Sequence, residues 1–125
     1  MTDEANELSG RAIDAGLKVH RALGPGLLES VYEQCFAREL ELRGIAFKRQ
    51  VWLPINYEGV ELAAGYRLDL IVAGLLIVEI KAVETLSRLH QAQLLSYLRL
   101  SGLHVGLLMN FNVLLFRDGL KRMVI

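Results

Sequence analysis

The chain has 125 residues, of which 53% are hydrophobic and 22% are charged. These proportions exclude a disordered tail and predict one compact domain over residues 1–125. The 14 basic and 14 acidic residues cancel, which excludes a strongly basic protein that binds nucleic acid through its overall charge. Contact with nucleic acid would then depend on a local basic patch or on metal ions.

The sequence carries no sign of a membrane or an oxidising compartment. A single cysteine, Cys35, cannot form an internal disulfide. Residues 1–10 are acidic and polar, unlike a signal peptide. The longest apolar run, residues 70–78, is much shorter than the roughly 20 residues that a transmembrane helix needs. We therefore expect a cytoplasmic protein that does not enter a membrane.

The first half of the chain predicts two helices followed by four strands. Apolar residues recur at spacings of three and four over residues 5–22 and 27–43, with a break at Gly24-Pro25-Gly26. Apolar and β-branched segments then predict strands at 46–57, 60–62, 66–72 and 75–82. Glu58-Gly59 and Ala73-Gly74 are typical of tight turns between them.

The second half predicts a helix and three more strands. The helix covers residues 86–100, and the strands cover 104–110, 113–117 and 120–125, with a hairpin turn at Asp118-Gly119. The order is α-α-β-β-β-β-α-β-β-β. A helix between two groups of strands implies a crossover, so we expect an α/β fold in which helices flank a mixed β-sheet.

Asp69, Glu79 and Lys81 interrupt strands that are otherwise apolar. A buried unpaired charge is costly, so such groups pair with each other or bind a metal. Glu79 and Lys81 are two residues apart and share a face. Asp69 joins them only if the hairpin pairs around Gly74, with a three-residue loop at 73–75. A two-residue loop at 73–74 would send Glu79 to the other face.

Two carboxylates on one face suit Mg²⁺ or Mn²⁺, which take oxygen ligands. A lysine beside the ion can hold a water or hydroxide, or stabilise charge that develops on a phosphate. The alternative is a structural ion pair between Glu79 and Lys81, with Asp69 capping a turn. The residues alone leave both interpretations open.

Polar residues on two helices are further candidates. His90, Gln93 and Tyr97 form one stripe on the third helix, which is either its solvent side or faces the same cleft. Glu29 falls in the first turn of the second helix, where a carboxylate stabilises the helix dipole. A functional role for Glu29 is the alternative.

These residues together resemble a known pattern. Asp69 followed by Glu79-Ile80-Lys81 resembles the D…ExK core of the PD-(D/E)XK nuclease superfamily. The segment Gln93–Tyr97 resembles the QxxxY motif of its recombination helicase–nucleases. The segment from His20 through Gly26, Glu29 and Tyr32 resembles the motif of the small bacterial GxxExxY proteins, which are assigned to the same superfamily. The proline that often precedes the first acid is replaced by Leu68.

The resemblance implies a role for each residue. Asp69 and Glu79 would ligate Mg²⁺ or Mn²⁺, with the Ile80 carbonyl as a further ligand. Lys81 would position the attacking water or stabilise the charge on the phosphate. Glu29 would support a metal-bound water or orient Lys81. The remaining candidates would shape the site and contact the substrate: Gln93 and Tyr97, with His90 and His20 more peripheral.

The resemblance thus implies a restriction-endonuclease-like domain that hydrolyses phosphodiester bonds, with DNA as the expected substrate. The complete set of Asp69, Glu79, Lys81 and Gln93 favours an enzyme. Small size and zero net charge favour a rival interpretation, in which the chain is a weak or inactive nucleic-acid-binding subunit of a DNA-processing complex. An unrelated metal-free α/β domain is a third interpretation. A homodimer is compatible with the size of the chain.

Overall fold

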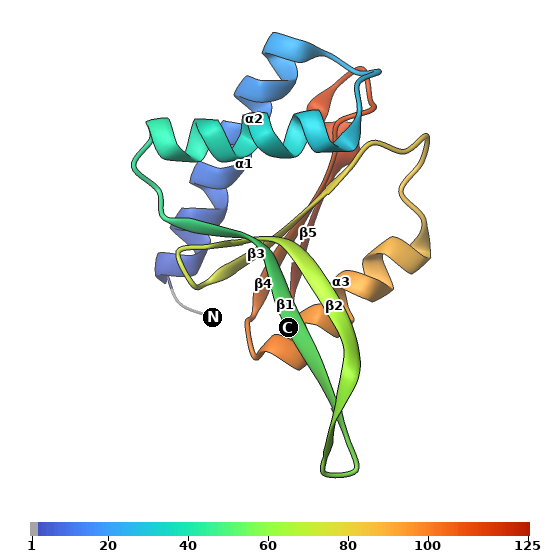
Figure 1. Cartoon of the computed structure of the whole chain (residues 1–125). Helices are drawn as coiled ribbons and strands as arrows, with labels where there is room; N and C mark the ends of the chain where they lie inside the picture. The colour runs from blue at the N-terminus through green and yellow to red at the C-terminus, as the bar shows by residue number, and fades with distance from the viewer. Residues whose placement is uncertain (1–2) are drawn as a thin grey trace.

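Figure 1 shows the computed structural model of the chain, which describes residues 3–125. Residues 1–2 of the predicted domain lie outside the described residues. Two helices come first, α1 (Asp3–Leu23) and α2 (Glu29–Leu42), and they cross each other at the top of the view. None of the helices within residues 3–125 is long and apolar enough to cross a membrane.

Five strands form one sheet in the order β1-β2-β3-β4-β5. Their bounds are β1 (Phe47–Tyr57), β2 (Val60–Val72), β3 (Leu76–Lys81), β4 (Val105–Asn110) and β5 (Leu120–Val124). β3 and β4 are parallel, and the other neighbours are antiparallel. The parallel pair is joined by α3 (Arg88–Ser101), which is the crossover that the sequence predicted. The predicted fold class, a mixed α/β sheet flanked by helices, is confirmed.

Apolar cores lie on both faces of the sheet. On one face, Phe36 of α2 and residues of α1 pack with Leu70 of β2. On the other face, Leu94 of α3 packs with Ile77 of β3. The central strands β3 and β4 are buried throughout except at Lys81, as expected for strands that are covered on both sides.

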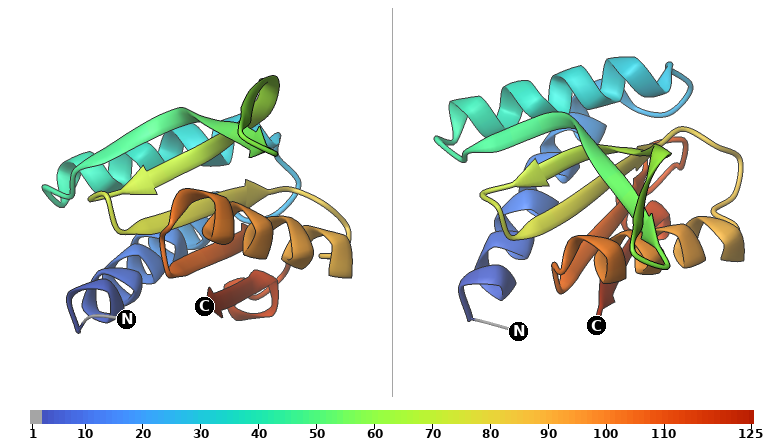
Figure 2. Two further views of the ribbon diagram at one scale, coloured as in Figure 1. Left: turned by 90° about the horizontal axis from the view of Figure 1, so that it is seen from below. Right: turned by 60° about the horizontal axis from the view of Figure 1, so that its bottom comes forward.

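The strands β1 and β2 extend beyond the rest of the sheet as a two-stranded arm (Figures 1 and 2). β3 pairs only with residues 70–72 of β2, whereas β1 pairs with β2 as far as Tyr57 and Val60. The arm turns at Glu58 and Gly59, whose φ angles are 51° and 80°. The predicted turn at these two residues is therefore confirmed.

The separate strands predicted at 60–62 and 66–72 are one strand, β2. Gly65 does not break it, because Gly65 is paired with Pro54 of β1. A Cβ atom at this position would lie 2.6 Å from the Leu53 carbonyl oxygen and 2.8 Å from the Trp52 ring. Gly65 therefore permits a close approach of the two strands instead of ending one of them.

The predicted strand at 113–117 and the hairpin turn at Asp118-Gly119 are wrong. Residues 116–119 form a 3₁₀ helix, and β5 pairs directly with β4. The side chain of Phe116 is buried, whereas Leu114 is 87% exposed. Because β5 occupies the edge of β4, a strand at 113–117 would have no neighbour with which to pair.

The loop between α1 and α2 is held by Tyr32. The Tyr32 hydroxyl donates to the Gly24 carbonyl oxygen at 2.6 Å and accepts from the Leu27 N–H at 3.0 Å. Its ring is fully buried and stacks on Phe111 with centroids 4.8 Å apart. Tyr32 therefore fixes the loop that leads into Glu29, the first residue of α2.

We predict that Tyr32→Phe lowers the free energy of unfolding by about 1–3 kcal/mol, because it leaves two backbone groups of the loop without their partner. Urea denaturation measures the change. The matched control is Tyr57→Phe, since Tyr57 is 69% exposed at the end of the arm. That control should stay within about 0.5 kcal/mol of the unsubstituted chain. Equal effects of the two substitutions would contradict the role given to the Tyr32 hydroxyl.

Candidate metal centre between two strands

The hairpin of β2 and β3 meets the register condition that the sequence set. Val72 pairs with Leu76, so the connection has three residues, 73–75. Ala73 and Gly74 have φ angles of 50° and 69°, and the Val72 carbonyl accepts from the Leu75 N–H at 3.0 Å. The pairing is centred on Gly74, so positions 69 and 79 face each other across the two strands.

Side chains replace the backbone ladder at this point. The last ladder pair is Leu70 with Val78. Beyond it, the Asp69 N–H donates to Glu79 Oε2 at 2.8 Å, and the Ile80 N–H donates to Asp69 Oδ2 at 2.8 Å. Each carboxylate thus accepts a hydrogen bond from a backbone N–H of the opposite strand. These reciprocal bonds hold both acids between β2 and β3.

Burial raises the pKa values of both acids. Glu79 is 5% exposed, and its burial, together with the charge of Asp69, raises its pKa to about 8 against the effects of the Asp69 N–H and Lys81. Burial also raises the pKa of Asp69 to about 6, although the Ile80 N–H opposes the shift. Two carboxyl groups this close do not both ionise readily without a cation.

The remaining carboxylate oxygens are open. Within residues 3–125, no hydrogen bond reaches Asp69 Oδ1 or Glu79 Oε1. Every buried side-chain oxygen in the described part of the chain has a hydrogen-bond partner. Because Asp69 Oδ1 and Glu79 Oε1 have none, both atoms are accessible to solvent. No group of three His, Cys, Asp or Glu side chains in that part could hold a metal. The donor set is therefore two carboxylates, which fits an ion such as Mg²⁺ that keeps several waters.

Lys81 and Glu29 lie around this pair. Lys81 ends β3 and is half-buried, and its charge lowers the pKa values of Asp69 and Glu79. Glu29 is exposed at the start of α2, and its charge raises both pKa values. No salt bridge joins Glu79 to Lys81 among the described residues, whose salt bridges lie at Glu39 and Glu33. The structural ion pair considered as an alternative is therefore absent there.

Helix α3 brings Tyr97 to the site. Tyr97 is 8% exposed, and its ring lies 5.4 Å from that of Tyr66 on the arm. Burial raises the pKa of Tyr97, and the charges of Glu79, Tyr66 and Asp69 add to the shift. Its hydroxyl therefore stays protonated beside the acids. Gln93 is half-buried one helical turn earlier on α3.

The two histidines make structural contacts. His90 Nδ1 accepts from the Ser87 N–H at 3.0 Å, and Ser87 Oγ accepts from the His90 N–H at 3.2 Å. This reciprocal pair caps α3 in the way that a capping box does. His20 is buried, and its Nε2 lies 2.7 Å from the Val113 carbonyl oxygen. A substrate contact by His90 stays a prediction.

The structure also brings in residues that the sequence motifs did not indicate. Glu33 of α2 is 7% exposed, and its charge raises the pKa of Asp69. Its carboxylate accepts from Arg49 and Gln50 of β1. Asn110 at the end of β4 is buried and bonds both the N–H and the carbonyl of Val83. Hydrophobic spacing places such residues on elements but does not reveal which partners they meet.

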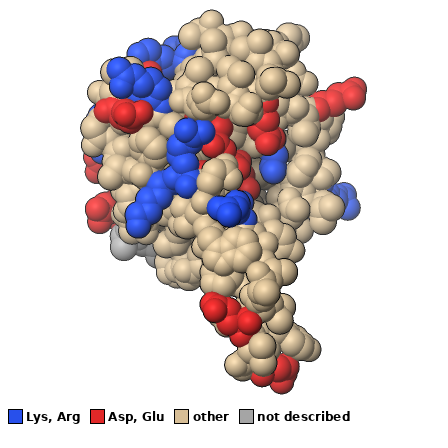
Figure 3. Space-filling view, viewed as in Figure 1, with Lys and Arg blue, Asp and Glu red and all other residues tan. Residues whose placement is uncertain are grey.

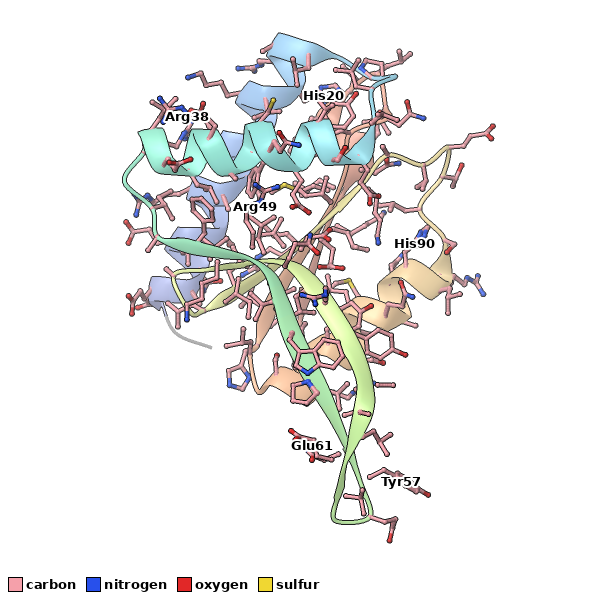
Figure 4. All side chains as sticks on the ribbon, in the orientation of Figure 1. His20, Arg38, Arg49, Tyr57, Glu61 and His90 are labelled. Atoms are coloured by element: carbon pink, nitrogen blue, oxygen red, sulfur yellow. The ribbon has the colours of Figure 1, made fainter. Side chains whose placement is uncertain are left out.

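Charge is unevenly distributed around the site. Figure 3 shows acidic side chains gathered in a hollow near the middle of this face, with basic side chains on both sides of it. Figure 4 shows Arg49 between α2 and the sheet, and His90 at the start of α3. The tip of the arm carries Tyr57 and Glu61 well away from the hollow.

The fold agrees with a comparison against known families. The model of the PD-(D/E)XK nuclease superfamily matches residues 6–123, nearly the whole chain. The chain therefore belongs to the PD-(D/E)XK nuclease superfamily. No significant match was found among curated proteins or among solved structures.

The raised pKa values predict how stability depends on pH without metal. Both acids bind a proton more tightly in the folded than in the unfolded chain, so the folded state loses stability as pH rises from about 4 through about 8. From pH 6 to pH 9, the loss should be about 3 kcal/mol. The double variant Asp69→Asn, Glu79→Gln keeps acceptor oxygens and should lose much less. Urea denaturation in EDTA measures both, and equal losses would contradict the raised pKa values.

Proposed function

We propose that this chain is a metal-dependent nuclease that hydrolyses phosphodiester bonds of DNA. The observation that carries the proposal is the pair of buried carboxylates, Asp69 and Glu79, each with one oxygen bonded to backbone and one left open. Membership of a nuclease superfamily supports the reaction class. The extent of the family match supports treating residues 1–125 as one domain.

Asp69 and Glu79 would hold Mg²⁺ or Mn²⁺, with the Ile80 carbonyl as a further ligand. The ion would polarise the scissile phosphate and lower the pKa of a water molecule. The Lys81 ammonium would hold the attacking water and offset the negative charge that develops on the phosphate. Glu29, exposed at the start of α2, would orient that lysine.

Substrate contacts would come from both sides of the acid pair. Tyr97 is the buried residue of α3 that carries a hydroxyl, and Gln93 lies one turn before it. On the arm, the Arg67 guanidinium lies over the Trp52 ring, 5.8 Å from its centroid. Arg67 precedes Asp69 by two residues, so it would meet the phosphate backbone near the scissile bond.

A nucleic-acid-binding subunit with little activity of its own is the second candidate. The zero net charge favours it, because a small nuclease with no excess of basic residues binds DNA weakly by itself. In that case the chain would bind metal and DNA but would cleave only with a partner subunit or as a homodimer. The two candidates differ in turnover by the isolated chain.

We predict that the wild type binds Mn²⁺ and cleaves DNA, and that Asp69→Asn, Glu79→Gln does neither. Lys81→Gln should still bind Mn²⁺ but lose at least about 100-fold in cleavage rate, because it removes a charge that acts on the transition state. Titration calorimetry and cleavage of single- and double-stranded DNA measure these effects in the same samples. Metal binding without cleavage by the wild type would favour the binding subunit. Cleavage by the double variant would refute the site.

We also predict that Mn²⁺ binding at pH 7 releases about one proton, because Glu79 with a pKa of about 8 is mostly protonated at that pH and a metal ligand must be ionised. Calorimetry in buffers of different ionisation enthalpy gives the number of protons. Release should fall toward zero above about pH 9. Binding without proton release at pH 7 would show that Glu79 is already ionised.

A further inference from the structure

Gln50 has a backbone conformation that is unusual within a strand. Its φ angle is 51°, in the left-handed region. Glu58 and Ala73 are the other non-glycine residues with positive φ in the described part of the chain, and both lie in turns between paired strands. Gln50 lies inside β1, between residues that pair with β2. A side chain in this conformation is strained unless its surroundings hold it.

Gln50 lies opposite Asp69, at the point where the side chains of β1 and β2 exchange faces of the sheet. Val51 pairs with Leu68, and the residue before Gln50 pairs with Leu70, so the register is constant through this step. Alternate residues of a strand normally share a face. Leu70 nevertheless packs in the core of α1 and α2, whereas Leu68 packs in the core of α3. The faces therefore reverse at Gln50 and Asp69.

The reversal frees Asp69 for the reciprocal bonds with β3. Leu70 is still in the ladder with Val78, but the Asp69 N–H bonds to the Glu79 side chain and the Asp69 carboxylate to the Ile80 N–H. A regular β2 would keep Asp69 in the ladder and direct its side chain to one face. The position of the Asp69 carboxylate thus depends on the reversal of faces at Gln50 and Asp69.

The side chain of Gln50 connects this part of β1 to α2 through hydrogen bonds. Gln50 Nε2 donates to both oxygens of Glu33, at 2.9 and 3.2 Å. Arg49 donates to Glu33 Oε2 from Nε at 3.1 Å and from Nη2 at 2.8 Å. Glu33 itself follows Tyr32, which is fully buried, so its carboxylate is held by a helix that is packed into the core.

We propose that Gln50, acting through Glu33, is a positioning residue that holds the strand reversal and so keeps Asp69 in contact with Ile80 and Glu79. A glycine would adopt the same backbone conformation without strain, but it would lack the amide that reaches Glu33. The presence of glutamine at a position that suits glycine is explained by this contact. The proposal concerns the metal-free geometry, and only its consequence for metal binding rests on the proposed function.

The test separates backbone strain from the amide contact. Gln50→Gly relieves the strain and removes the amide. Glu58→Gly is the matched control, because Glu58 has the same φ of 51° but lies at the tip of the arm. For each variant, urea denaturation gives the stability, and hydrogen exchange by NMR gives the protection of the Ile80 N–H. Titration calorimetry gives the affinity for Mn²⁺.

Glu58→Gly should gain stability by relief of strain alone, whereas in Gln50→Gly the loss of the bonds to Glu33 should offset that gain. Only Gln50→Gly should speed exchange of the Ile80 N–H, by about ten-fold, and weaken Mn²⁺ binding by about ten-fold, as loss of a contact behind a metal ligand does. Glu33→Gln, which removes the charge that Arg49 and Gln50 bind, should act in the same direction. Unchanged exchange and affinity in Gln50→Gly would overturn the proposal. If the wild type binds no Mn²⁺, the proposed function fails, while exchange at Ile80 still decides the role of Gln50.

Discussion

The arrangement of the site depends on one interaction: two carboxylates that replace the backbone ladder between β2 and β3. Asp69 and Glu79 are drawn between the strands because each accepts a backbone N–H there. The bonds compensate part of the cost of burying two acids, but their raised pKa values show that the compensation is incomplete without a cation. Two neighbouring buried acids with raised pKa values are typical of a functional centre. The rest of the fold supplies the support, with α2 on one side of the strands and α3 on the other.

Much of the fold followed from the sequence, and so did the central pair. The apolar periodicity gave the helices and the parallel crossover, because buried central strands and a helix between them leave few alternatives. The sequence alone defines the hairpin condition: with a loop at 73–75 the two acids meet, and with a loop at 73–74 they do not. The structure has the three-residue loop. The sequence defines these two alternatives but does not decide between them, because Ala73-Gly74 is compatible with both turns.

Other features depend on contacts that are distant in the chain. Residues 113–117 have a strand-like composition, yet β5 occupies the neighbouring edge of β4. Glu33 and Gln50 belong to no motif and become visible only when β1 and α2 are seen together. The strain at Gln50 has no signature in composition, because a positive φ in a strand is set by tertiary contacts and not by residue type.

We propose that the open oxygens of Asp69 and Glu79 form a divalent metal centre. The most direct measurement is anomalous X-ray diffraction from crystals of the wild type soaked in Mn²⁺, recorded at the manganese absorption edge. We expect one strong anomalous peak within about 2.0–2.4 Å of an oxygen of each carboxylate, and its loss in crystals of the double variant with amides at both positions. Manganese bound elsewhere, or absent from this position while both strands keep the register described here, would contradict the account.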